Sequence, residues 1–151
     1  MSLFKRLLLS ALILAVFSSG YLLGSFQGTA VSKELRIGYQ NSSHSGQIDY
    51  PYIFTDTKDD TVIDNFLMIY LYPDKVEEAE VNLENPDLYV LMLNPDRGIG
   101  MIDSRIWFQK EEAVIAERIG ETWEEVEYFQ VDKNTADYIK EVIEEEAGEA
   151  E

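Results

Sequence analysis

The chain has 151 residues, of which 29 are acidic and 12 are basic, and its formal net charge is −17. Eight basic and 28 acidic residues follow position 36, so this part of the chain carries a formal charge of −20. A field of that sign repels phosphate backbones and anionic lipid headgroups, which argues against binding to nucleic acid or to an acidic membrane surface. The chain has no cysteine, which excludes disulfides, thiolate zinc sites and cysteine nucleophiles.

Residues 1–30 have the layout of a secretory signal. A basic pair, Lys5 and Arg6, comes before eleven uncharged and mostly apolar residues. Small side chains stand at the first and third positions before two candidate cleavage sites, after Gly20 and after Ala30. We therefore expect this segment to direct export, and its removal would leave a secreted protein.

The same segment predicts a membrane anchor if it is not cleaved. No charged residue occurs from Leu7 to Ser32, a run of 26 residues, and about 20 predominantly apolar residues suffice to span a bilayer. Since the basic residues precede this run, the positive-inside tendency places the following domain outside the cytoplasm in either case. Gly20, Gly24 and Gly28 would share one helix face, which permits a dimer of closely packed membrane helices, or they are simply the small-residue tail of a signal peptide.

The rest of the chain predicts a linker over residues 31–50, one extracytoplasmic domain over residues 51–147 and an acidic tail over residues 148–151. The linker is polar, with one short apolar alternation typical of an edge strand, at Leu35, Ile37 and Tyr39. One domain is expected because about 115 residues can bury a single core.

The domain begins with a predicted helix over residues 58–72, because Thr57 and Asp60 form a capping-box pattern before apolar residues at helical spacing. A second helix is expected from Asn134, as its cap. Between them the apolar period changes to two, which predicts strands at Ala79–Leu83, Leu88–Asn94, Ile99–Phe108, Ala113–Ile119 and Val126–Val131. This order indicates an α+β fold, with an antiparallel sheet of four to five strands and two helices packed on one face, preceded by the N-terminal signal or anchor helix.

Four aspartates near the start of the first predicted helix are candidate calcium ligands, since calcium prefers hard oxygen ligands: Asp56, Asp59, Asp60 and Asp64. Their spacing is not that of an EF-hand, because Lys58 stands at the third loop position and no glycine stands at the sixth. The sequence thus offers calcium as the one candidate cofactor.

Trp107 is the centre of a candidate recognition surface. Alternation places it on one face of its strand with Asp103 and Arg105, and places Ile106 on the other face with Ser104. If the face of Ile106 meets the helices, Trp107 lies on the open side of the sheet, where a large aromatic beside Arg and Asp is typical of a binding surface. If Trp107 faces the core instead, its role is packing.

Catalytic constellations are scarce in this sequence. The single histidine, His44, lies in a polar Ser-rich segment, and neither a catalytic triad nor a three-histidine metal site can be built from one histidine. No Gly-rich phosphate loop and no nucleophile elbow is present. The pattern favours a non-catalytic protein, and only an enzyme that uses paired carboxylates stays open.

Several short features resemble a family of small uncharacterised exported domains of Bacillus and its relatives, many of them lipoproteins, which we term YhfM-like. The features are Phe54-Thr55-Asp56, Asn85-Pro86-Asp87, Ile106-Trp107-Phe108, and Tyr128 followed by Ala136 and Ile139. The resemblance implies a non-catalytic extracytoplasmic module without established functional residues. The chain departs from the lipoprotein pattern because no cysteine follows its leader.

The sequence therefore predicts a cell-envelope interaction module that binds a protein or peptide partner through its sheet face or an exposed edge. Two alternatives remain at this point. One is a small secreted enzyme that uses carboxylates, with or without calcium. The other is an acidic inhibitor or immunity-type protein, whose charge of −20 would produce a salt-sensitive complex with a basic protein.

Overall fold

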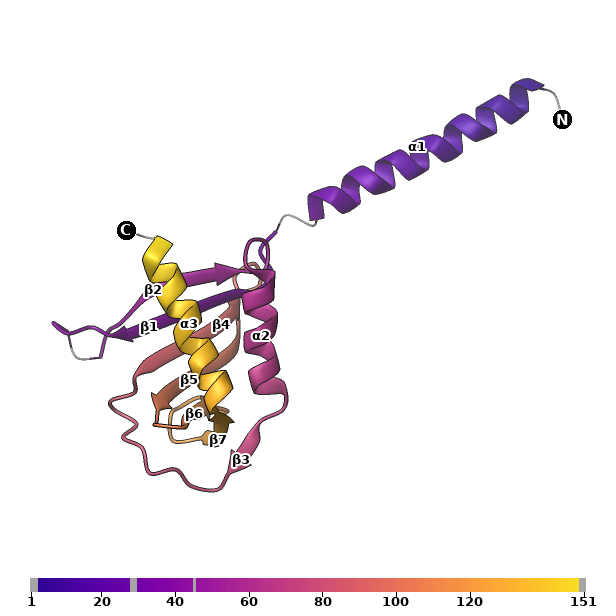
Figure 1. The fold of residues 1–151 in the computed structure, drawn as a ribbon. Helices are drawn as coiled ribbons and strands as arrows, with labels where there is room; N and C mark the ends of the chain where they lie inside the picture. Colours follow the sequence, from indigo (N-terminus) through magenta and orange to yellow (C-terminus); the bar gives the residue numbers. More distant parts are fainter. Residues whose placement is uncertain (1–2, 28–29, 45, 150–151) are drawn as a thin grey trace. The chain divides into compact units, whose positions relative to one another are not determined.

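The computed structural model describes residues 3–27, 30–44 and 46–149, and the chain divides into two units, residues 1–30 and residues 31–151 (Figure 1). The first unit contains helix α1, Leu3–Gln27, which is 25 residues long. Within the described residues, no helix combines the length and the apolar character that crossing a membrane requires. Export and membrane anchoring remain predictions from the sequence.

The second unit is an α+β domain built on one antiparallel sheet, as predicted, but the sheet has seven strands and not four to five. The spatial order of the strands is β2-β1-β4-β5-β6-β7-β3, and every neighbouring pair is antiparallel. In chain order the elements are β1 (Glu34–Gln40), β2 (Ile48–Thr55), α2 (Asp60–Leu71), β3 (Asp74–Val76), β4 (Leu88–Asn94), β5 (Ile99–Phe108), β6 (Glu112–Arg118), β7 (Val126–Asp132) and α3 (Lys133–Glu149).

The additional strands come from segments where the sequence signal is weak. Residues 31–50, expected to be a linker with an edge strand, supply β1, which pairs with β2 on one side and β4 on the other. Strand β2 is itself one edge of the sheet, and β3 is the other. The strand expected at Ala79–Leu83 is absent, and those residues are irregular. Which of these segments form strands is determined by pairing across the sheet, and a local sequence pattern does not contain that information.

Helix α2 begins two residues later than predicted, at Asp60, because the predicted capping box does not form. Asp59 is the N-cap residue, and its side chain makes no capping hydrogen bond. Its Oδ2 atom instead accepts a hydrogen bond from the backbone N–H of Thr55 (3.1 Å). The carbonyl of Thr55 in turn accepts from the N–H groups of Lys58 (3.1 Å) and Asp59 (2.7 Å), so a turn at the end of β2 replaces the first helical residues.

Helix α3 begins one residue earlier than predicted, and a residue of β7 caps it. Asp132, at the end of β7, accepts a hydrogen bond at Oδ1 from the N–H of Thr135 (2.9 Å), and the helix begins at Lys133 and not at Asn134. The predicted acidic tail is helical up to Glu149, the last residue that the structure describes.

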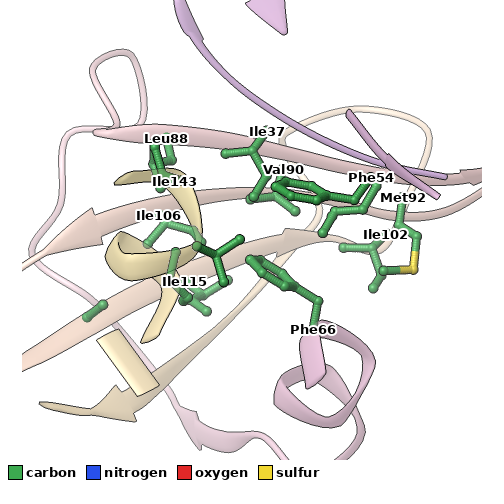
Figure 2. Packing of buried hydrophobic residues seen from close by; sticks show 14 of the residues in the cluster. Ile37, Phe54, Phe66, Leu88, Val90, Met92, Ile102, Ile106, Ile115 and Ile143 are labelled. Carbon is green, nitrogen blue, oxygen red and sulfur yellow. The ribbon is translucent and has the colours of Figure 1, made fainter. Parts of the chain in front are cut away.

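Both helices pack on the same face of the sheet and form the main core with it (Figure 2). From α2, Ile63 and Phe66 are fully buried, and from α3 Ile139 is fully buried. The sheet contributes alternate residues of six strands, at Leu35, Ile37, Phe54, Leu88, Val90, Met92, Ile102, Ile106, Ala113, Ile115 and Phe129. The period of two thus directs these side chains toward the helices.

The opposite face of the sheet carries a second, smaller apolar cluster. Its buried members are Trp107, Val114 and Ala116. The segment of residues 77–87, which connects β3 at one edge to β4 in the interior, packs on this cluster through Ala79, Val81 and Leu83. Part of the sheet is therefore covered on both faces, which explains why β6 is buried at four successive positions.

Candidate functional site

The candidate recognition residues share the face of the sheet that points away from the helices, but Trp107 is not exposed there. The side chain of Trp107 is 8% exposed. Its Nε1 atom donates to the carbonyl oxygens of Asn82 (3.1 Å) and Asn85 (3.2 Å) in the covering segment. Trp107 therefore packs residues 77–87 against the sheet. It lies on the face away from the helices, as the first predicted alternative had it, but its role there is packing, as in the second.

Arg105 lies beside it between two aromatic rings. Its guanidinium carbon is 3.8 Å from the ring centroid of Trp123 and 5.6 Å from that of Tyr89, and one terminal nitrogen donates to the carbonyl of Leu83. Among the described residues, Nε of Arg105 is the one buried side-chain nitrogen or oxygen without a hydrogen-bond partner. These contacts hold the cation in the covering layer by cation–π attraction.

Asp103 remains partly accessible on the same face. It pairs with Arg118, whose Nε and terminal nitrogen lie 2.7 Å and 2.6 Å from Asp103 Oδ2, and each side chain is 30% exposed. Arg118 also donates to the carbonyl oxygens of Gly120 and Glu121. The predicted recognition group is thus one contiguous set, but two of its three members are engaged by loops.

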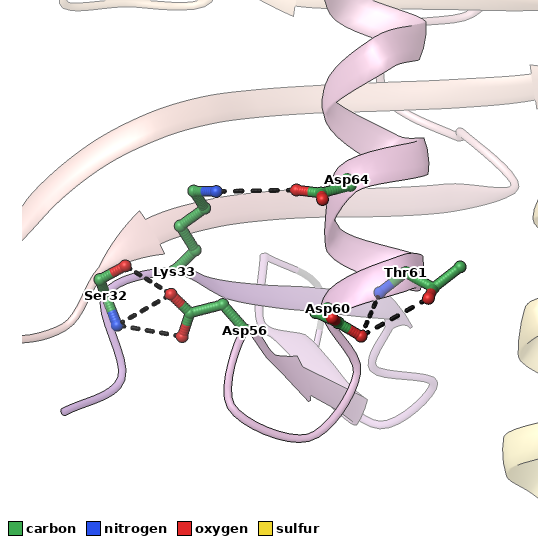
Figure 3. A network of polar contacts seen from close by, with 6 residues as sticks. All are labelled: Ser32, Lys33, Asp56, Asp60, Thr61 and Asp64. Atoms are coloured by element: carbon green, nitrogen blue, oxygen red, sulfur yellow. Dashed lines mark hydrogen bonds and ion pairs between the residues drawn. The ribbon is translucent and has the colours of Figure 1, made fainter. Parts of the chain in front are cut away.

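The four calcium candidates each contact a different partner, and Figure 3 shows three of them, Asp56, Asp60 and Asp64. Asp56 accepts from the N–H and hydroxyl of Ser32, and Asp64 lies 3.7 Å from Lys33 Nζ. Asp60 accepts from the N–H of Thr61 (2.8 Å), and Asp59 accepts from the N–H of Thr55 (3.1 Å). Partial burial raises the pKa of Asp56, but the hydrogen bonds from Ser32 outweigh it and lower the pKa overall. Across the described residues, no group of three or more acidic or histidine side chains could hold a metal ion.

His44 lies in the exposed connection between β1 and β2, where its backbone N–H donates to Asn41 Oδ1 (2.9 Å). The glycine face expected on the leader falls on α1, where the positions of Gly20 and Gly24 have open space around them. Gly28 lies outside the described residues. No described contact tests the proposed dimer.

A buried polar group that the sequence analysis missed lies under the end of α2. The hydroxyl oxygens of Tyr70 and Ser104 are 2.6 Å apart, and Ser104 is 1% exposed. Burial raises the pKa of the Tyr70 phenol. The alternation of Ser104 with Ile106 was the available signal, because it places a hydroxyl on the helix-facing side of β5.

The pKa of the Glu117 carboxyl group on β6 is raised. Glu117 lies directly opposite Glu127 in the β6–β7 pair, and Glu127 is 2.5 Å from Lys75 Nζ on β3. Burial first, and then the charge of Glu127, raise the pKa of Glu117, while Lys75 lowers it. Tyr70 adds a hydroxyl nearby, because Glu117 contributes to its raised pKa. The arrangement is a like-charge pair across β6 and β7, and β3 lies next to it at the edge of the sheet.

A concave surface, which we call the α2–α3 hollow, lies between α2 and α3. Its volume is about 580 Å³. It is lined by Asn65, Met68, Ile69 and Tyr72 of α2 and its C-cap, Asp74 of β3, Gln130, Val131 and Asp132 of β7, and Asn134, Thr135 and Tyr138 of α3. Asn65 Nδ2 donates to the Tyr138 hydroxyl (3.1 Å), which joins the two helices. The lining combines apolar side chains, amides and two carboxylates, and contains no lysine or arginine.

Comparisons with protein-family models, with curated proteins and with solved structures found no match to this chain. The resemblance to the YhfM-like family therefore remains a prediction.

Proposed function

We propose that the chain is an extracytoplasmic interaction module of the cell envelope, which binds a polypeptide partner and has no catalytic role. The single observation that carries this proposal is the exposed apolar surface at the α2–α3 hollow. Tyr72 is 80% exposed and Met68 is 54% exposed, and both line the hollow. Large apolar side chains gathered at a concave surface with a polar rim are typical of a protein interaction site.

The neighbouring surface extends this apolar area. Leu71, in the last turn of α2, is 62% exposed. The hollow itself is lined by Ile69 and Val131, both partly buried and packed against the main core. A partner side chain placed there would contact a rigid surface, because α2 and α3 are fixed on the sheet. Rigid placement lowers the entropic cost of binding.

The leader supports the location in this proposal. A basic pair followed by 26 uncharged residues directs export or anchoring. Expression of the full chain in a Gram-positive host, separation of membrane from medium and N-terminal sequencing would test it. A start at Tyr21 or Val31 in the medium would identify a diffusible module, an intact chain in the membrane a tethered one, and protein confined to the cytoplasm would contradict export.

Photocrosslinking tests the binding function directly. A photoreactive amino acid replaces Tyr72 in the full chain, and irradiated cells are analysed for covalent adducts. The matched control carries the same amino acid at Tyr39, which is 39% exposed and does not line the hollow. We expect a discrete adduct from position 72 and none from position 39. No adduct at position 72, or the same adducts at both positions, would contradict the proposed interaction site.

The alternative of a carboxylate-dependent enzyme has one specific observation in its favour, the raised pKa of Glu117 near two hydroxyls. Two features weaken it. Glu117 does not line the α2–α3 hollow, and its neighbour Glu127 is already paired with Lys75. The interaction module therefore accounts for more of the described surface than the enzyme does.

A further inference from the structure

We propose that the α2–α3 hollow binds a cationic segment of the partner, in which a lysine or arginine stands next to a large apolar side chain. This inference rests on the proposed function and specifies the chemistry of its partner. In this arrangement the apolar side chain packs on Met68 and Tyr72, and the basic side chain reaches Asp74 and Asp132.

The two carboxylates of the hollow are available to a cation. Asp74 and Asp132 both line it, and neither takes part in any of the ion pairs among the described residues. Among the described residues, the lining contains no lysine or arginine, so no cationic side chain of the hollow pairs with these carboxylates, and Asp132 accepts a hydrogen bond there from the Thr135 N–H (2.9 Å). An arriving ammonium or guanidinium group would supply the missing counter-charge.

The helix that ends at the hollow adds to the same preference. Helix α2 ends at Leu71 with Tyr72 as its C-cap, and no basic residue lies in its last turn. The carbonyl groups of a helix C-terminus carry a partial negative charge that favours cations, and here no side chain of the helix offsets it. The last turn therefore presents both the apolar anchor surface and a negative potential.

The start of α3, which also faces the hollow, does not reverse this preference. A free helix N-terminus would attract an anion, but Asp132 already accepts the N–H of Thr135 (2.9 Å) and places a carboxylate at that end. Lys75 and Lys133 follow the two carboxylates in the sequence, but they pair with Glu127 and Asp137 and do not line the hollow.

The charge of the whole domain argues against the other occupants. The chain after position 36 carries −20, and this field repels an acidic partner and a second copy of the same chain alike. It attracts a basic segment from a distance and accelerates its association, in a manner that salt suppresses. Charge complementarity thus selects a basic polypeptide segment for this surface.

Fluorescence anisotropy with the purified full chain tests the inference. The probe is a labelled ten-residue peptide in which two lysines flank one phenylalanine, and the matched probe has glutamate in place of both lysines. We expect the lysine peptide alone to bind, with a Kd that rises about tenfold between 50 mM and 500 mM salt.

Variants of the hollow localise the binding. Asp74→Asn and Tyr72→Ala are each expected to raise the Kd about fivefold or more, and circular dichroism checks that the fold is retained. Asp96→Asn is the control, since Asp96 is an exposed acid in the β4–β5 turn and its loss changes the net charge equally. If Asp96→Asn weakens binding equally, the effect comes from the overall field of the domain, and the proposed site is overturned. A Kd that Tyr72→Ala leaves unchanged would also overturn the site.

The remaining outcomes separate this inference from the proposed function. Binding of the glutamate peptide, or no binding of either probe, together with a discrete crosslink at position 72 in cells, would overturn the cationic chemistry but keep the interaction module. No binding and no crosslink would overturn both. A dimer of the full chain that Tyr72→Ala dissociates would identify a second copy as the occupant and overturn the cationic partner.

Discussion

Replacement of Trp107 by phenylalanine should loosen the segment of residues 77–87 without unfolding the sheet. The substitution keeps an aromatic ring but removes the indole N–H, which is shared between the carbonyls of Asn82 and Asn85. One shared donor is worth about 1 kcal/mol, and the smaller ring leaves a gap that costs on the order of 1 kcal/mol more. We expect a loss of about 2 kcal/mol, or a fall in Tm of roughly 8 °C for a domain of this size.

Two assays follow the consequences of this change. Thermal unfolding measures the loss of stability, and digestion with a glutamate-specific protease reports the segment itself, which contains Glu77, Glu78, Glu80 and Glu84. Cleavage there should accelerate in Trp107→Phe, because proteolysis follows local opening. Trp123→Phe is the control, since a phenyl ring can still stack on Arg105. Unchanged Tm and unchanged cleavage in Trp107→Phe would refute the claim that this indole fixes the segment.

Three further outcomes can be measured by thermal or chemical unfolding. Tyr70→Phe and Ser104→Ala should each cost about 1–3 kcal/mol, because each leaves a buried hydroxyl unpaired; the double variant should cost less than their sum, and strict additivity would show that the 2.6 Å contact is not energetically coupled. Glu117→Gln should raise stability by about 0.5 kcal/mol at pH 7 by removing the charge opposite Glu127. Since the folded-state pKa of Glu117 is raised, its charge destabilises the fold above that pKa, and the gain of the variant should vanish as the pH falls below the unfolded value of 4.5; a gain independent of pH would contradict this. Millimolar calcium should leave the Tm unchanged against chelator, because the aspartates of residues 56–64 contact separate partners; a rise in Tm would reinstate a calcium site.

Local patterns predicted the central part of the fold well. The predicted strands Leu88–Asn94 and Ile99–Phe108 match β4 and β5, and the turn between them uses Asn94 Oδ1 as the acceptor for Arg97 N–H and Gly98 at a φ of 63°. These strands are strongly apolar and their connection is short, so pairing follows from neighbouring residues alone. The α+β class followed from the change of period between the two helices.

The edges of the sheet could not be predicted in the same way. Strand β3 has three residues and exists because it pairs with β7, some fifty positions further along the chain. The first part of the domain had the same difficulty, since β1 combines a polar flank with only two fully buried side chains, Leu35 and Ile37. Gly38 illustrates why β1 could not be predicted from its own residues, because a Cβ atom there would lie 2.0 Å from the carbonyl oxygen of Asp49. Such a close approach of strands is a tertiary constraint that no alternation pattern contains.

In the candidate site, the alternation of residues predicts which face of the sheet a side chain lies on, but it does not predict whether another segment covers that face. Alternation correctly placed Asp103, Arg105 and Trp107 on one face, opposite the helices. Whether that face is open depends on residues 77–87, and this segment covers it with irregular backbone, carbonyl acceptors and three small or medium apolar side chains. A period of two in Ala79–Leu83 predicts a strand, whereas the same apolar residues here pack onto an existing sheet. Because that face is covered over Trp107, the exposed apolar side chains beside the α2–α3 hollow are the stronger argument for a binding surface.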